Sequence, residues 1–124
     1  MTASHIRCLL AVLALSDQCE RVASKDIARL LGVRKPTVHN TLAALKQRGM
    51  IDKERYGDVR LTAEGAELAR ELERQRDELT LLACRLGLEP GEGAQFAALL
   101  LSGLSRQGIE RLCAAQCRAQ RALT

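Results

Sequence analysis

The chain has 124 residues, enough for one modest hydrophobic core or for two small ones joined by a helix. Trp is absent and aromatic residues make up only 2% of the sequence, which excludes an aromatic platform for stacking single-stranded or RNA bases. The formal net charge is +4, and an excess of this size indicates a partner only if it is concentrated in one region.

An N-terminal helix is predicted from the helical spacing of Ile6, Leu9 and Leu13, with Ser4 as its N-cap. The apolar run 9–15 is too short to span a bilayer, so we expect no membrane partner. The five cysteines are an odd number and lack the spacing of a disulfide framework. These features favour a cytoplasmic protein over a secreted one.

Residues 24–62 have the spacing of a winged helix-turn-helix. Residues 24–32 predict a short helix with Ser24 as its N-cap and Gly32 as its left-handed stop. A second helix is expected to open at or beside Pro36 and to stop at Gly49. Its inward residues are predicted to be Val38, Leu42 and Leu45. Two short strands, at 50–51 and 59–61, would then form a wing around a turn at 55–58.

Positive charge is concentrated on the second helix and the wing. Between Val33 and Thr62 there are seven Lys or Arg residues and three acidic residues, a net of +4, so the remaining charges cancel. Such a gathered excess is expected of a surface that contacts phosphates. We therefore predict that the protein binds double-stranded DNA with its second helix in the major groove.

The predicted DNA contacts form two groups. The residues expected to hold phosphates are Lys35, Lys46, Arg48, Lys53 and Arg55, of which Arg55 would also probe the minor groove. The residues expected nearest the base edges are Arg34, Thr37, His39, Asn40 and Thr41. An alternative is a winged-helix module that binds another protein and leaves DNA untouched. We expect no enzyme, because two histidines so placed cannot assemble a catalytic triad and no glycine-rich phosphate loop is present.

The second half of the chain predicts three helices. Thr62 would cap a long helix that runs to about Leu86, with a charged stretch at 73–78 expected to cross solvent between two packed regions. Its apolar stripe is predicted to be Leu68, Leu72, Leu79, Leu82 and Leu86. A loop is expected at 87–93, followed by helices at 94–104 and 105–123.

The fold class expected is therefore mainly α. It combines a winged helix-turn-helix DNA-binding domain at 1–62 with a long linker helix and a helical dimerisation domain at 63–124. The leucine-rich C-terminal helices are too small to cover themselves, which favours a homodimer joined through residues beyond about Leu79. Each copy would then read one half of a near-palindromic operator.

Several segments spread over nearly the whole chain carry a family resemblance. They are 24–28, 33–38, 56–65, 77–79, 86–88, 104–105 and 109–111. Together they resemble the iron- and manganese-dependent repressors of the diphtheria toxin repressor and manganese transport regulator family. The resemblance implies a dimerising second half and a divalent cation, Mn²⁺ or Fe²⁺, at the junction of the two halves.

The ligand positions implied by this resemblance depart from the family. They fall on Ser4, Arg7, Arg76, Ala98, Leu101 and Ser102. No residue of this set suits a first-row divalent metal, and two of them are cationic. We therefore expect no metal cofactor, and a repressor whose inherited metal switch is degenerate.

Two alternatives for regulation remain open: a response to Mn²⁺, Fe²⁺ or a thiophilic metal, and a response to redox state. Cys113 and Cys117 stand four residues apart on one predicted helix. Cys8 and Cys84 fall on the helices that flank the metal junction in the resembled family. These four cysteines are the candidate sensor residues, and the alternative is that each is simply a small apolar residue.

Overall fold

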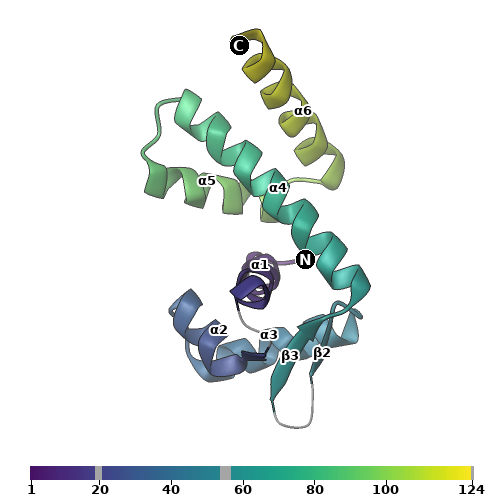
Figure 1. The fold of residues 1–124 in the computed structure, drawn as a ribbon. Helices are drawn as coiled ribbons and strands as arrows, with labels where there is room; N and C mark the ends of the chain where they lie inside the picture. Colours follow the sequence, from purple (N-terminus) through teal and green to yellow (C-terminus); the bar gives the residue numbers. More distant parts are fainter. Residues whose placement is uncertain (19–20, 54–56, 124) are drawn as a thin grey trace. The chain divides into compact units, whose positions relative to one another are not determined.

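The protein is described by a computed structural model that covers residues 1–18, 21–53 and 57–123 (Figure 1). Within these ranges the chain forms two compact units, Met1–Arg70 and Glu71–Thr124. The elements are α1 (Ala3–Gln18), β1 (Val22–Ala23), α2 (Ser24–Leu31), α3 (Lys35–Gln47), β2 (Ile51–Lys53), β3 (Asp58–Leu61), α4 (Ala63–Arg85), α5 (Pro90–Gly103) and α6 (Arg106–Leu123). The mainly α fold with a winged helix-turn-helix is confirmed. The division at 62/63 into a DNA-binding and a dimerisation domain stays a prediction.

The first unit is built on the packing of α1, α2 and α3. Leu9, Ile27, Leu42 and Leu45 are fully buried there, at the positions that helical periodicity assigns to the inner faces. Full burial of one such side chain contributes about 1.5–3 kcal/mol, so a few of them hold the three helices together.

Two of the predicted helix caps are wrong by one or two residues. The backbone at Ala23 is already extended because β1 pairs there with β3, so Ala23 takes the N-cap position and Ser24 is the first residue of α2. At the start of the chain, the hydroxyl of Thr2 accepts a hydrogen bond from the His5 amide, and Ser4 lies inside α1. The stop at Gly32 is confirmed, with φ of 68°.

The wing belongs to a three-stranded antiparallel sheet in the order β1-β3-β2, not to a two-stranded hairpin. Figure 1 shows β2 and β3 as the arms of the wing. In their antiparallel pairing, Ile51 lies opposite Leu61. Asp58, expected in the turn, is the first residue of β3. The third strand, β1, has only two residues, too few to show alternation in the sequence.

The start of α4 is fixed to the end of α3 by Thr62. Its hydroxyl accepts a hydrogen bond from the Gly65 amide at 3.0 Å and donates one to the Gly49 carbonyl at 2.6 Å, which confirms Thr62 as a cap. Gly65 passes so close to Met50 that an added Cβ would lie 1.8 Å from the Met50 carbonyl oxygen. Only glycine fits this approach.

The second unit contains the rest of α4, with α5 and α6. Its buried apolar residues are Leu72, Leu79, Ala83, Ala97, Leu101, Ile109 and Cys113. Two predictions fail here. Leu86 is 65% exposed because α4 ends at Arg85, ahead of Gly87 with φ of 93°. The charged stretch 73–78 is not wholly solvated, since Gln75 is buried.

Helix α5 begins at Pro90, four residues before the predicted start. Proline is pre-organised for the first turn of a helix, and of the glycines in that turn only Gly93 is packed. Gly93 is buried, and a Cβ built on it would lie 3.5 Å from the Thr80 side chain and 3.6 Å from Ala83, so glycine lets α5 approach α4 closely. No helix in the described part of the chain is long and apolar enough to span a membrane.

Candidate nucleic-acid interface

The outer face of α3 is exposed along its whole length. Val38, Leu42 and Leu45 are buried on its inner face. Because an α-helix has about 3.6 residues per turn, the opposite stripe consists of Pro36, Asn40, Ala43 and Gln47, all of them exposed. Asn40 lies in the middle of this stripe, with both amide donor and acceptor groups facing solvent.

Three residues of this stripe, Pro36, Ala43 and Gln47, were not among the predicted contacts. Ala43 and Gln47 follow Asn40 by three and seven residues, and both are exposed. Ala43 leaves room for a partner surface to approach the helix closely, and Gln47 adds another amide. The spacing from the buried Leu42 and Leu45 could have identified both, since it fixes which side of the helix faces out.

Basic side chains surround the exposed stripe. Arg34 is the N-cap residue of α3 and Arg48 is its C-cap residue; both are exposed. Lys35 and Lys46 are exposed on the helix itself. The amino end of α3 is also the positive end of the helix dipole, so Arg34 and Lys35 lie where an anion is favoured. The predicted contact Arg55 lies outside the described residues.

A side-chain hydrogen bond joins the wing to α3. The ammonium group of Lys53, on β2, lies 3.2 Å from Nδ1 of His39 on α3. An ammonium group only donates, so Nδ1 must accept, and the proton of the neutral ring is then on Nε2. His39 therefore presents an N–H donor at its other ring nitrogen.

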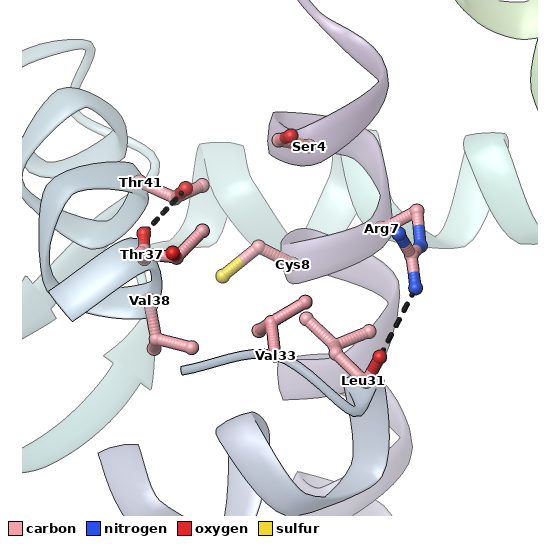
Figure 2. Close-up of a pocket in the computed structure, with 8 residues that line it drawn as sticks. All are labelled: Ser4, Arg7, Cys8, Leu31, Val33, Thr37, Val38 and Thr41. Atoms are coloured by element: carbon pink, nitrogen blue, oxygen red, sulfur yellow. Dashed lines mark hydrogen bonds between the residues drawn. The ribbon is translucent and has the colours of Figure 1, made fainter. Parts of the chain in front are cut away.

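Thr41 differs from the other predicted base contacts. Its side chain is half-buried, and its hydroxyl donates a hydrogen bond to the Thr37 carbonyl at 3.0 Å (Figure 2). Helical geometry places it toward the inner face, away from Asn40. Thr37 is exposed, so of these two threonines only Thr37 remains accessible to a partner from outside.

A cavity of about 20 Å³ lies against α3 and is lined by Ser4, Arg7, Cys8, Leu31, Val33, Thr37, Val38 and Thr41. Figure 2 shows the side chains that line it. This volume holds roughly one water molecule. The sulfur of Cys8 points into it, and burial raises the pKa of the Cys8 thiol to about 11. Cys8 is thus a neutral thiol in the core of the first unit, a poor candidate for a sensor at neutral pH.

The positive charge of Arg48 reaches the start of α1. The pKa of His5 is lowered by burial first, and then by the nearby charges of Arg48 and the N-terminal amine. Both repelling charges favour the neutral imidazole of His5. His5 therefore adds no charge of its own to this end of the basic surface at neutral pH.

The positions implied for a metal site do not fit Mn²⁺ or Fe²⁺. Arg7 donates a hydrogen bond to the Leu31 carbonyl at 3.2 Å, and Arg76 pairs with Asp77 at 3.4 Å. The Ser102 hydroxyl donates to carbonyls of its own helix, and Leu101 is a buried hydrocarbon. This set contributes two cations and no carboxylate or imidazole, whereas Mn²⁺ and Fe²⁺ need oxygen and nitrogen donors.

The four candidate sensor cysteines are dissimilar. Cys8 is buried in the first unit, and Cys84 is exposed on α4. Cys113 is buried and Cys117 is half-buried, one turn apart on α6. Of the four, only Cys113 and Cys117 lie on the same helix.

A model of the MarR family matches residues 1–60, the part of the chain that holds α1 to β3. No curated protein matches the sequence. Among solved structures, the manganese regulator SloR is similar with a TM-score of 0.77 and 26% identity, over 90% of this chain and 53% of that chain. The hypothetical protein SSo2273 from Sulfolobus solfataricus has a TM-score of 0.68 and 17% identity, over 90% of this chain and 86% of that one.

The IdeR protein of T. acidophilum is similar with a TM-score of 0.64 and 22% identity, over 93% of this chain and 53% of that chain. The chain thus spans about half the length of SloR and IdeR. These likenesses extend past the winged helix into the second half of the chain. The resemblance predicted from the sequence is confirmed at the level of the fold.

Proposed function

We propose that this protein is a sequence-specific DNA-binding regulator of transcription. The observation that carries the proposal is the exposed face of α3, where Asn40 is centred between Lys35 and Lys46. An asparagine can bond an adenine edge in the major groove through two hydrogen bonds, while flanking lysines neutralise phosphates. The similarity to the manganese regulator SloR also supports a role in regulation.

The proposed contacts follow from exposure. Lys35, Lys46, Arg48 and Lys53 would hold phosphates, and Arg55 would do so from the wing. Arg34, Thr37, His39 and Asn40 would face base edges, with His39 acting as a donor through Nε2. Thr41 is left out of this group because its hydroxyl is bonded within α3.

We further propose that the protein acts as a homodimer in the cytoplasm and represses its targets by competing with polymerase for promoter DNA. Large apolar side chains are exposed in the second unit at Leu81, Leu86, Leu99, Leu104 and Leu123. A second copy would cover such a surface, and two-fold symmetry would present one α3 to each half of a near-palindromic operator.

The proposed regulator does not respond to Mn²⁺ or Fe²⁺, although SloR is a manganese regulator. The donor set described above supports this proposal, because arginines occupy two of the positions implied for ligands. Equilibrium dialysis of the full chain against Mn²⁺ tests it. Tight binding of one ion per chain would contradict it.

The DNA-binding proposal is tested by selecting duplexes from a random library at low salt and titrating the selected duplex with salt. Contact with several phosphates predicts a steep loss of affinity as salt rises. The competing function is docking of another protein on the exposed leucines, and burial of apolar surface would be nearly insensitive to salt. Failure to enrich any duplex would favour that second function.

A further inference from the structure

Two thiols lie one helical turn apart on the inner face of α6. Cys113 is buried and Cys117 is half-buried, and both are free cysteines. Residues four apart on a helix have Cβ atoms about 5–6 Å apart. Zinc–thiolate bonds are about 2.3 Å long, and a soft cation held between two thiolates at a similar distance in a linear arrangement needs sulfurs about 4.6 Å apart. Side-chain rotation at two neighbouring positions can meet this requirement.

Charged side chains of α4 act on this pair. Arg74 lies close enough to both thiols for its charge to act on them, while Glu71 and Glu78 act on Cys113. Arg74 is held in place by Glu71, whose carboxylate accepts two hydrogen bonds from its guanidinium group.

An unsatisfied donor lies beside the same two residues in the chain. Gln116 is only 1% exposed, and its Oε1 accepts a hydrogen bond from Arg85. Its Nε2 has no hydrogen-bond partner among the described residues. A buried N–H group without a partner is unusual in a folded protein.

We propose that Cys113 and Cys117 form a two-coordinate site for a soft monovalent cation of the Cu(I) type. Binding breaks two S–H bonds, forms two S–Cu bonds and releases two protons to solvent, and copper remains Cu(I) throughout. The bis-thiolate complex carries a charge of −1, which Arg74 is placed to balance.

The chemistry of the site selects this class of cation. No group of three or more His, Cys, Asp or Glu in the part of the chain that the structure describes is arranged to hold a metal ion. Divalent first-row metals usually require four to six ligands, whereas thiolates alone select soft ions. Two sulfurs without a third ligand therefore favour a linear, two-coordinate ion.

The test is anaerobic titration of the full reduced chain with Cu(I) in competition with a colorimetric chelator. The wild-type chain and Cys84→Ser should each bind one Cu(I) per chain. Cys117→Ser and Cys113→Ala should each bind more than about 100-fold more weakly, because even outer-shell changes cost 10–100-fold. Arg74→Gln should weaken binding roughly tenfold, and Arg70→Gln should not.

Several outcomes would overturn the site. They are wild-type binding too weak to compete with the chelator, binding that survives in both Cys113→Ala and Cys117→Ser, and binding that is lost in Cys84→Ser. Circular dichroism of the helices shows whether each variant folds. If Cys113→Ala fails to fold, Cys117→Ser still tests the site, because Cys117 is only half-buried. The experiment measures metal binding, so its result does not depend on whether the protein binds DNA. Only a role of this metal site in regulation rests on the proposed function.

Discussion

The ammonium group of Lys53 donates a hydrogen bond to Nδ1 of His39 at 3.2 Å, joining the wing to the helix that carries the exposed polar stripe. The two residues are fourteen positions apart in the chain. The bond fixes the tautomer of His39 and holds a positive charge beside α3. It links the position of the wing to the surface that we propose reads DNA.

Lys53→Gln should weaken DNA binding because one phosphate contact is lost; any added loss on the selected duplex alone would come from His39, whose hydrogen bond to Lys53 is also removed. The slope of log affinity against log salt should fall by roughly 0.9, the value expected for one phosphate. The measurement is a salt titration by fluorescence anisotropy. Arg111→Gln, which removes one exposed charge from α6, should leave the slope unchanged. An unaltered slope in Lys53→Gln would remove this residue from the interface.

Asn40→Ala should relax sequence preference without weakening non-specific binding. The loss for the selected duplex should be about 1–3 kcal/mol, the usual discrimination of one bidentate base contact. Competition between the selected and a scrambled duplex measures this difference. Asn40 is exposed, so thermal stability should not change. Gln107→Ala, an amide exposed on α6, serves as the control. Equal losses on both duplexes would mean that Asn40 does not read bases.

Gly65→Ala should destabilise the first unit, because the added Cβ would lie 1.8 Å from the Met50 carbonyl oxygen. We expect a loss of about 2 kcal/mol or more, equivalent to a drop in Tm of roughly 8 °C. Gly91→Ala is the matched control: it is helical, no atom lies within 4 Å of its added Cβ, and it should be neutral or stabilising. Calorimetry showing equal Tm values for the two variants would contradict the close approach.

Cys8 should make stability fall at high pH. Burial raises the pKa of its thiol from 9.0 to about 11, so the unfolded chain loses this proton more readily than the folded one. Stability is unaffected below pH 9 and decreases as pH rises toward 11, by about 2 kcal/mol. Urea unfolding at several pH values should show this decrease in the wild type and a smaller one in Cys8→Ala. Parallel curves for the two proteins would show that Cys8 titrates normally.

Leu99→Glu should dissociate the proposed dimer, because Leu99 is 70% exposed in the second unit and a buried unpaired carboxylate is costly. Sedimentation velocity at micromolar concentration should give a dimer for the wild type and a monomer for the variant. Leu30→Glu, a similar change at an exposed leucine of the first unit, should remain dimeric. A monomeric wild type would refute the dimer outright.

Local patterns in the sequence were enough to predict the helices and one face of the candidate site. Val38, Leu42 and Leu45 recur at helical spacing, and this alone determines that Asn40 faces outward, because the helix repeat is set by backbone geometry. Gly32 and Thr62 likewise act on residues next to them in the chain, so their roles as helix stop and cap followed from residue type.

The tertiary structure decided what depends on residues far apart in sequence. Because β1 pairs with β3, α2 begins at Ser24 and not after it. Because Gly93 packs on α4, the segment predicted as a loop forms the first turn of α5. The bond between Lys53 and His39, and the burial of Cys113 near Arg74, depend on contacts between separate elements. Periodicity reports which side of an element is buried, but not which partner buries it; that choice is made only when the elements pack.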